Sequence, residues 1–222
     1  KEEQESSKWG VRDDITFDTV YDLISQKGNT NSQKPLLIGY STLSSHQPWD
    51  VPIHHFDDEV HNSFYYLDQC IGNFIEKLRK SAVWDNTLVI MLPDHGFPYQ
   101  VKDESDPLLN HIPMIWVGGA VKAPRRIEQV CNQTDLPATL LGQLGINHDD
   151  YIFSRDVLSK TYTQPFAIHT YDDGYTMMDS ATFVNYDFIG ERVVTEQGKK
   201  NPILLQWGRA ILQAASKDLN SR

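Results

Sequence analysis

Cysteine is scarce in this sequence of 222 residues, which contains only Cys70 and Cys131. Two cysteines supply neither a disulfide framework nor the paired spacing of a zinc knuckle, so they leave the redox compartment undecided. Long apolar runs are also lacking, and none reaches the length of a membrane span. The chain shows no signal peptide and begins at Lys1 without Met. That start is expected either of a mature product or of an excised piece.

Positive charge is in short supply as well. The sequence has 20 Lys and Arg against 30 Asp and Glu, which gives a formal net charge of −10. Nucleic-acid-binding surfaces need a basic patch, so we expect no nucleic-acid partner. An anionic substrate is not excluded, because a bound metal ion can reverse the local field. The composition, 40% hydrophobic and 23% charged, is that of a globular protein, and we expect one domain over residues 1–222.

The stretch with the clearest chemical signal is an apolar run over residues 88–92 that ends abruptly at Pro93, Asp94, His95 and Gly96. Such a run predicts a strand buried on both faces. In open α/β sheets, ligands bind at the carboxyl ends of the strands. Carboxylate oxygen and imidazole nitrogen together suit Zn²⁺, Mn²⁺ or a similar ion, so Asp94 and His95 are candidate metal ligands. The alternative is an Asp that caps a helix beside an ordinary loop His.

A second apolar run, residues 34–43, predicts another buried strand. It leads into Ser44, Ser45 and His46, a polar cluster at the carboxyl end of that strand. A His in this place could hydrogen-bond an anionic oxygen or transfer a proton. The alternative is that these three residues simply turn the chain.

The predicted elements alternate between helices and strands, which indicates βαβ units. We therefore expect an α/β fold with a mostly parallel sheet flanked by helices, followed by a small C-terminal antiparallel hairpin and a terminal helix. An alternative boundary near Thr161 would make residues 161–222 an α+β appendage. The predicted helices cover residues 14–25, 57–80 and 134–144 and begin again at Pro202; the predicted strands cover residues 34–43, 88–92, 112–118 and 166–171, with a hairpin over 182–190 and 191–196.

Five segments, taken in order, resemble the sulfatase family of the alkaline phosphatase superfamily, and within it the lipoteichoic acid synthase (phosphoglycerol transferase) branch. The match covers about residues 9–150 and is weak after about residue 165. The order and spacing of the segments make it more specific than any single motif. The segments are Trp9-Gly-Val-Arg-Asp13, Ser41-Thr-Leu-Ser-Ser-His-Gln-Pro-Trp49, Tyr66-Leu-Asp68 with Ile71-Gly72, Trp84-Asp-Asn-Thr-Leu-Val-Ile90 with Asp94-His-Gly96, and Ile112-Pro-Met-Ile115 with Gln133-Thr-Asp-Leu-Pro-Ala-Thr-Leu-Leu141.

This resemblance implies an alkaline phosphatase-like fold and a catalytic divalent metal, Mn²⁺ first, with Zn²⁺, Mg²⁺ and Ca²⁺ as alternatives. It implies that Asp94 and His95 hold the metal and that His46 binds the anion in catalysis. Trp9 and Asp13 match a segment that lines the substrate headgroup pocket. The mechanism it implies is nucleophilic: an activated oxygen attacks phosphorus or sulfur while the metal neutralises the developing charge.

The chain departs from the family pattern at the nucleophile. The family's nucleophile and its acidic metal ligand precede the segment that matches Trp9, and only 8 residues stand there in this sequence. No Cys/Ser-x-Pro-x-Arg signature is present. We therefore expect this chain to be the C-terminal part of a catalytic domain, with no nucleophile of its own and no activity alone.

Two functions follow as hypotheses. The first is a metal-dependent transferase or hydrolase of phosphate (phosphoglycerol-type) or sulfate esters. It would work outside the cytoplasm, in the periplasm or at the cell surface, anchored to the membrane in the full-length protein. Its substrate would be an anionic small molecule, lipid headgroup or glycan, and the sequence leaves phosphate and sulfate open. The second is a non-catalytic module that binds anionic glycans or lipid headgroups.

Overall fold

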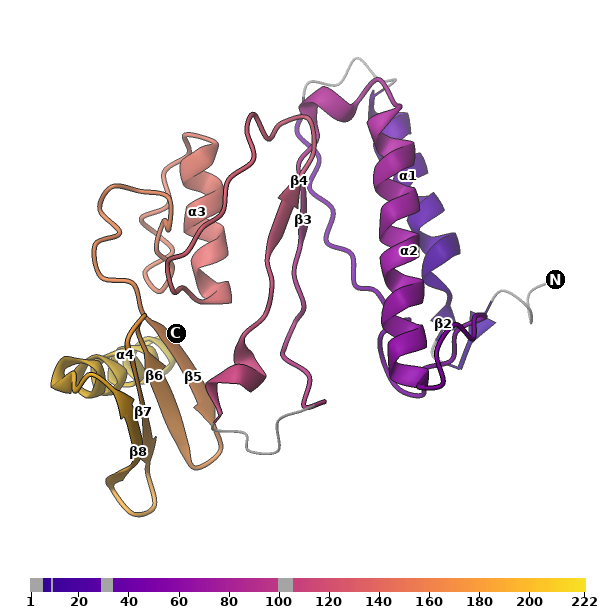
Figure 1. Cartoon of the computed structure of the whole chain (residues 1–222). Helices are drawn as coiled ribbons and strands as arrows, with labels where there is room; N and C mark the ends of the chain where they lie inside the picture. Colours follow the sequence, from indigo (N-terminus) through magenta and orange to yellow (C-terminus); the bar gives the residue numbers. More distant parts are fainter. Residues whose placement is uncertain (1–5, 9, 29–33, 100–105) are drawn as a thin grey trace. The chain divides into compact units, whose positions relative to one another are not determined.

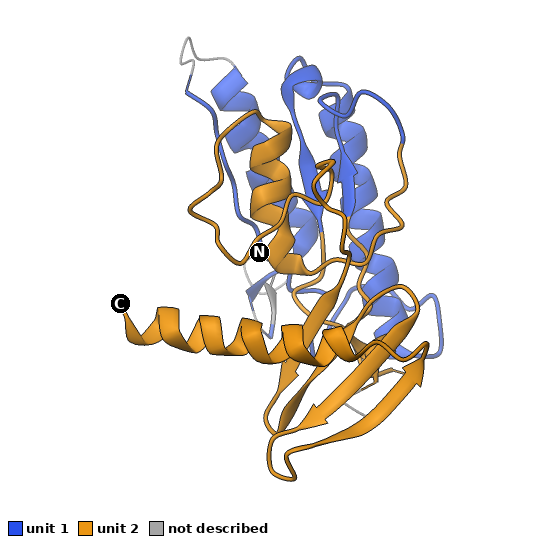
Figure 2. Cartoon of the chain, turned by 90° about the vertical axis from the view of Figure 1, so that its left-hand side faces the viewer, with its two compact units in different colours: residues 1–91, 115–124 blue, residues 92–114, 125–222 orange. Residues whose placement is uncertain are grey.

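The computed structural model describes residues 6–8, 10–28, 34–99 and 106–222. The chain forms two compact units (Figure 2). Unit 1 consists of Lys1–Met91 and Ile115–Pro124, and unit 2 of Leu92–Met114 and Arg125–Arg222. This division does not fall at Thr161, and the single domain stays a prediction.

Unit 1 is built on two long helices, α1 (Asp13–Gly28) and α2 (Glu59–Arg79). They lie side by side in Figure 1, with the rings of Phe17 and Phe74 5.0 Å apart between them. Asp58 caps α2 by accepting a hydrogen bond from the backbone N–H of His61 at 2.9 Å. Both predicted helices are confirmed. Their apolar residues recur every three or four positions, and this spacing gives each helix one apolar face to bury.

The strands of unit 1 pair differently from the expectation. β1 (Ser6–Ser7) pairs with β2 (Gly10–Val11), and β3 (Val89–Met91) follows the short turn η2 (Trp84–Asn86). β3 pairs antiparallel with β4 (Ile115–Val117). Parallel pairing needs a crossover, usually a helix. The described residues between β3 and β4 hold only one short helical turn, so the chain returns antiparallel.

The predicted strand over residues 34–43 is extended but pairs with no strand in the part of the chain that the structure describes. In Figure 1 it runs in the same direction as β3, and α2 connects the two. The two segments therefore run parallel with a helix between them, as the predicted βαβ unit requires. They are not hydrogen-bonded to each other in the described part of the chain.

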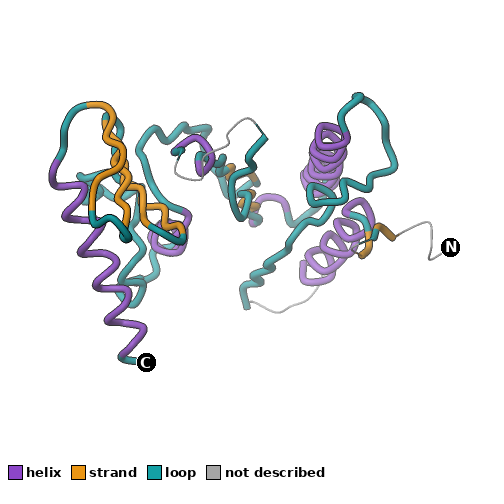
Figure 3. Tube along the Cα trace, turned by 90° about the horizontal axis from the view of Figure 1, so that it is seen from below, coloured by secondary structure: helices purple, strands orange, loops and turns teal. Residues whose placement is uncertain are grey.

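Unit 2 carries a four-stranded antiparallel sheet in the order β5-β6-β7-β8, with α4 (Pro202–Asn220) packed against it (Figure 3). The C-terminal hairpin is confirmed and belongs to a larger sheet. The sequence interpretation placed a turn at Asp172 but did not predict the strand that follows it, β6. The strands are β5 (Ala167–Tyr171), β6 (Gly174–Met178), β7 (Thr182–Asp187) and β8 (Arg192–Gly198); the remaining helical elements are η3 (Pro107–Asn110), η4 (Gln133–Asp135) and α3 (Leu136–Gln143).

Candidate metal and anion site

Asp94 and His95 follow β3 by a few residues, as the sequence predicts, and both side chains face solvent. Their side chains are 90% and 71% exposed. The backbone N–H of His95 donates to Asp94 Oδ1 at 3.0 Å, which holds the carboxylate beside the ring. The other carboxylate oxygen, Oδ2, lies 3.8 Å from His95 Nε2. The two side chains thus present an oxygen and a nitrogen to the same region.

The His95 ring is oriented by a hydrogen bond on its other nitrogen. Nδ1 lies 2.7 Å from the carbonyl oxygen of Gly96. A carbonyl only accepts, so Nδ1 carries the proton and Nε2 keeps its lone pair. Metal-bound histidines are typically oriented by such a contact, which sets the tautomer.

The geometry of this pair fits a divalent cation. Two ligands that each lie about 2.1 Å from one ion are at most about 4.2 Å apart, and the 3.8 Å between Asp94 Oδ2 and His95 Nε2 is within that limit. Among the described residues, no group of three or more His, Cys, Asp or Glu side chains is placed to hold a metal ion. Asp94 and His95 could therefore supply two ligands to a metal ion, and that role stays a prediction.

Gln133, which the sequence interpretation did not select, holds the backbone of this segment. Its side-chain Nε2 donates to the carbonyl oxygens of Pro93 at 2.6 Å and Asp94 at 3.0 Å. The segment is also packed closely against η3: a Cβ on Gly96 would lie 1.4 Å from the carbonyl oxygen of Leu109. Only glycine fits at that position, and the Asp-His pair cannot shift toward η3.

Gln133 is itself anchored through η4. Asp135, at the end of η4, is 1% exposed. Its carboxylate accepts hydrogen bonds from Arg155 Nε at 2.9 Å and Nη2 at 2.6 Å. It also accepts one from the backbone N–H of Asn132 at 2.9 Å. A buried carboxylate held by a guanidinium in this way fixes η4, and with it Gln133.

His46 lies in unit 1 on a tight turn after the extended segment 34–43. The turn is closed by hydrogen bonds from His46 N–H to Leu43 O at 3.1 Å and from Trp49 N–H to His46 O at 2.9 Å. As in His95, Nδ1 contacts a carbonyl oxygen, that of Gln47 at 2.7 Å, so the lone pair lies on Nε2. Unless the ring is doubly protonated, Nε2 acts as an acceptor or a base; once protonated, it donates to an anion.

Asp13 is placed where it supports this turn. It begins α1 and is 1% exposed. Its carboxylate accepts hydrogen bonds from the Tyr40 hydroxyl at 2.7 Å and from the backbone N–H groups of Leu43 at 3.2 Å and Ser44 at 2.8 Å. Burial raises the pKa of Tyr40, so the phenol stays protonated and donates. Lining a substrate pocket stays a prediction for Asp13, and Trp9 lies outside the described residues.

The buried cysteine of unit 1 is not an activated nucleophile. Burial raises the pKa of the Cys70 thiol to about 11. At neutral pH the group is therefore a thiol, whereas attack requires the thiolate.

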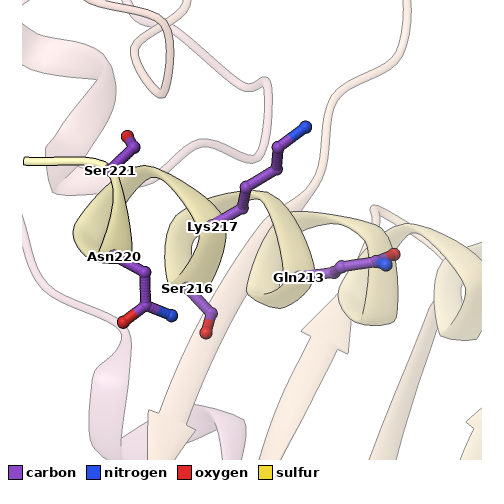
Figure 4. A pocket seen from close by; sticks show the side chains of 5 residues that line it. All are labelled: Gln213, Ser216, Lys217, Asn220 and Ser221. Atoms are coloured by element: carbon purple, nitrogen blue, oxygen red, sulfur yellow. The ribbon is translucent and has the colours of Figure 1, made fainter.

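A hollow on the surface of unit 2 does not coincide with the site. It has a volume of about 560 Å³ and lies along the last turns of α4 (Figure 4). Its lining is polar but contains no carboxylate or imidazole, so it has none of the ligands that a catalytic metal needs. The lining residues are Gln213, Ser216, Lys217, Asn220 and Ser221.

Residues 1–146 match the family described as Sulfatase. The chain belongs to the sulfatase family. The family predicted from the five sequence segments is thereby confirmed, and members of this family and of the alkaline phosphatase superfamily generally depend on divalent metals.

Curated relatives place the chain near phosphoglycerol transferases. It is 24% identical over 188 residues to lipoteichoic acid synthase 2 of Bacillus subtilis, covering 73% of this chain and 28% of that protein. It is 24% identical over 216 residues to the lipoteichoic acid synthase-like protein YvgJ of B. subtilis, covering 83% and 32%. With phosphoglycerol transferase I of Xanthomonas axonopodis it shares 22% identity over 148 residues, covering 61% and 20%. The chain thus spans about a third or less of these relatives.

A solved structure confirms the fold. A protein of the alkaline phosphatase superfamily from Vibrio parahaemolyticus superimposes with a TM-score of 0.81 at 22% identity, covering 97% of this chain and 56% of that one. The expected alkaline phosphatase-like α/β fold is therefore correct.

Proposed function

We propose that this chain supplies metal- and anion-binding residues to a divalent-metal-dependent enzyme that transfers or hydrolyses phosphate or sulfate esters. Membership of the sulfatase family supports this class of reaction. The observation that carries the proposal is the Asp94–His95 pair, with its 3.8 Å spacing and its fixed imidazole tautomer. Asp94 and His95 would hold the ion, which supplies charge neutralisation and activation of the attacking oxygen.

His46 is the proposed anion-binding and catalytic residue. Its Nδ1 contact with Gln47 O presents Nε2 for an anionic oxygen or a proton in transit. Asp13 fixes the backbone of the turn that carries His46, through the N–H groups of Leu43 and Ser44. The nucleophile belongs to a part of the enzyme outside this chain, so the chain alone is proposed to be inactive.

Phosphoglycerol-type phosphate esters are the preferred substrates. The support is the likeness to lipoteichoic acid synthase 2 and to phosphoglycerol transferase I. The substrate would be an anionic lipid headgroup or glycan, and Mn²⁺ is the preferred metal. We place the full-length enzyme outside the cytoplasm, anchored to the membrane. None of the helices described here combines the length and apolar character needed to cross a bilayer.

The test uses the longest polypeptide that the gene encodes through Arg222. Asp94→Ala should abolish turnover of bis(para-nitrophenyl) phosphate while the circular dichroism spectrum stays that of the unmodified protein. Asp150→Ala removes an exposed carboxylate elsewhere and should leave turnover intact. Undiminished turnover in Asp94→Ala would refute the assignment. Faster cleavage of para-nitrophenyl sulfate than of the phosphodiester would shift the substrate to sulfate esters.

Metal removal provides a second test on the same polypeptide. Treatment with EDTA should abolish turnover, and added Mn²⁺ should restore it, because the Asp94 and His95 ligands release an exchangeable ion. Turnover that survives complete removal of divalent metal would exclude this mechanism.

A non-catalytic module that binds anionic headgroups is the second candidate. It is favoured by the absence of a third metal-ligating side chain among the described residues. Retained binding of glycerophosphate together with no turnover, in the longest polypeptide that the gene encodes, would favour this candidate over the enzyme.

A further inference from the structure

In the part of the chain that the structure describes, the outer edge of the C-terminal sheet is closed by side chains and not by another strand. β5 is the first strand in the order β5-β6-β7-β8, so β6 pairs with it on one side only. On the other side, Asn132 Nδ2 donates to the carbonyl oxygen of Ile168 at 2.8 Å, and the Ile168 N–H donates to Asn132 Oδ1 at 2.9 Å. One amide side chain therefore makes the two bonds that a neighbouring strand would make.

Arg155 occupies the preceding outward-facing position on the same edge. Its Nη2 donates to the carbonyl oxygen of Phe166 at 2.8 Å, two residues before Ile168. Its guanidinium carbon also lies 3.8 Å from the centre of the Phe166 ring. Backbone groups that face the same side of a strand recur every second residue, and Asn132 and Arg155 follow that period. The two side chains together fasten the beginning of β5.

Both side chains also belong to the network that positions the candidate metal ligands. Asn132 directly precedes Gln133, whose Nε2 donates to the carbonyl oxygen of Asp94 at 3.0 Å. Arg155 holds the buried carboxylate of Asp135 with Nε at 2.9 Å and Nη2 at 2.6 Å. The short turn η4 is thus fixed to β5 at both ends, through Asn132 before its first residue and through Arg155 at its last.

We propose that Asn132 is a positioning residue for the metal site and that it couples the C-terminal sheet to occupancy of that site. Its bonds to Ile168 fix the backbone that carries Gln133, and Gln133 fixes the backbone of Asp94. Coupling between two sites is reciprocal, so an ion that requires this geometry also stabilises the contact with β5. The inference rests on the proposed metal site at Asp94 and His95, and it extends that site to a sheet beyond the family match.

A Mn²⁺ titration of the 222-residue chain tests the positioning role. The readout is the Mn²⁺ concentration at which broadening of the His95 ring signals in NMR spectra is half complete. Asn132→Ala should raise this concentration about 10-fold, the lower end of what outer contacts contribute to metal affinity. The control Asn201→Ala removes a hydrogen bond of 3.0 Å to Asp179 elsewhere in unit 2 and should leave the titration unchanged. Equal shifts in the two variants would reveal a general loss of stability and overturn the proposal.

A double-mutant cycle separates positioning from simple destabilisation. If Asn132 acts through Gln133, Asn132→Ala should add little once Gln133→Leu has already freed the backbone of Asp94. The expected change in the Gln133→Leu background is below about 2-fold, against about 10-fold in the unmodified chain. Variants that act independently multiply their effects on the titration. Multiplied effects would therefore contradict a route through Gln133.

Hydrogen exchange tests the reciprocal effect in the unmodified chain, where no variant has to fold. Saturating Zn²⁺, which is diamagnetic and leaves the NMR signals sharp, should slow exchange of the Ile168 amide at least about 5-fold. The amide of Val184 in β7, a strand paired on both sides, is the control and should not change. Unchanged exchange at Ile168 would overturn the coupling. Equal slowing at both amides would do so too, because the ion would then stabilise the unit as a whole.

Failure of this inference stays distinct from failure of the proposed reaction. If Mn²⁺ does not broaden the His95 signals of the unmodified chain, the metal site itself is overturned, and the inference with it. If the signals broaden and Asn132→Ala leaves the titration unchanged, only the positioning role is overturned, because the site then binds its ion without the contact to β5.

Discussion

At the scale of single residues, two side chains in the candidate site position the backbone of the segments that carry His46 and His95. Gln133 holds the carbonyl groups of Pro93 and Asp94, and Asp13 holds the N–H groups of Leu43 and Ser44. In both places the backbone groups that are held lie one to three positions before a histidine whose Nδ1 contacts a carbonyl oxygen. The positioning of His46 and His95 is therefore built from backbone contacts.

Gln133→Leu should weaken metal binding without removing a ligand. Loss of the two hydrogen bonds frees the backbone at Asp94, and outer contacts of this kind typically contribute about 10–100-fold in metal affinity. The measurement is the Mn²⁺ concentration that broadens the His95 ring signals in NMR spectra. Gln143→Leu alters an exposed glutamine at the end of α3 and should leave the titration unchanged. Identical titrations for the two variants would show that Gln133 does not position the pair.

Asp13→Ala should destabilise unit 1 strongly. It removes the acceptor of two partly buried backbone N–H groups, those of Leu43 and Ser44, and one partner of the Tyr40 hydroxyl, which costs about 2–4 kcal/mol in the free energy of unfolding. Urea denaturation measures the change. Asp22→Ala, an exposed carboxylate on the same helix, is the control and should cause no loss. A loss below about 0.5 kcal/mol for Asp13→Ala would contradict its structural role.

At the scale of elements, the sheet of unit 2 and α4 are fitted to each other at Gly208. A Cβ at that position would lie 2.3 Å from the Tyr175 ring and 2.9 Å from Met177 Cγ. Tyr175, Met177 and Leu204 form the centre of this core, and all three are fully buried. The helix therefore approaches the sheet as closely as a glycine allows.

Gly208→Ala should destabilise the protein, although alanine is the better helix former. Overpacking of a closed core costs about 1–3 kcal/mol, which exceeds the propensity gain of up to about 1 kcal/mol. Ser216→Ala on the exposed face of α4 should be neutral or slightly stabilising. Thermal unfolding distinguishes them, and a higher Tm for Gly208→Ala would show that the contact with Tyr175 is not tight.

The turn between β6 and β7 should be sensitive to acid. Burial by itself would raise the pKa of Asp179, but hydrogen bonds from Ala181, Asn201 and Thr182 outweigh it and lower the pKa. Because the folded-state pKa lies below the unfolded value of about 4, the stabilisation is present above that pH and is lost as pH falls through the folded pKa. Asp179→Asn should therefore show a smaller loss of stability between pH 5 and pH 3 than the unmodified chain, measured by urea denaturation across that range. Parallel curves would contradict this role.

The sequence predicts the helices well because their signal is local. Val60, Phe64 and Leu67 follow one another at helical spacing, and the structure has α2 there. Strand pairing is not local, so the sequence alone did not show that β3 would pair with β4 or that residues 34–43 would stay unpaired. The same holds for the site. Asp94 and His95 can be predicted from the local sequence, because they follow an apolar run that ends at Pro93. The contact between Gln133 and Asp94 cannot, because it joins positions far apart in the chain.

At the scale of the whole molecule, the chain is strongly acidic, with a net charge of −10. The 222-residue chain should show no turnover of phosphodiester or sulfate ester, since the nucleophile is proposed to lie outside it. Assays on this chain beside the longer polypeptide check this, and activity of the short chain would show that it holds its own nucleophile. We also expect no mobility shift with DNA or RNA, because a phosphate backbone is bound by clustered basic side chains.

The two compact units alternate along the chain, with residues 92–114 of unit 2 separating β3 from β4 of unit 1. During synthesis, β3 emerges from the ribosome before its hydrogen-bonding partner β4 emerges. The segment with Asp94 and His95 emerges in that interval, and Gln133, which holds it, emerges later still. The order of translation thus exposes the candidate metal ligands to the surrounding ions before the contacts that orient them exist.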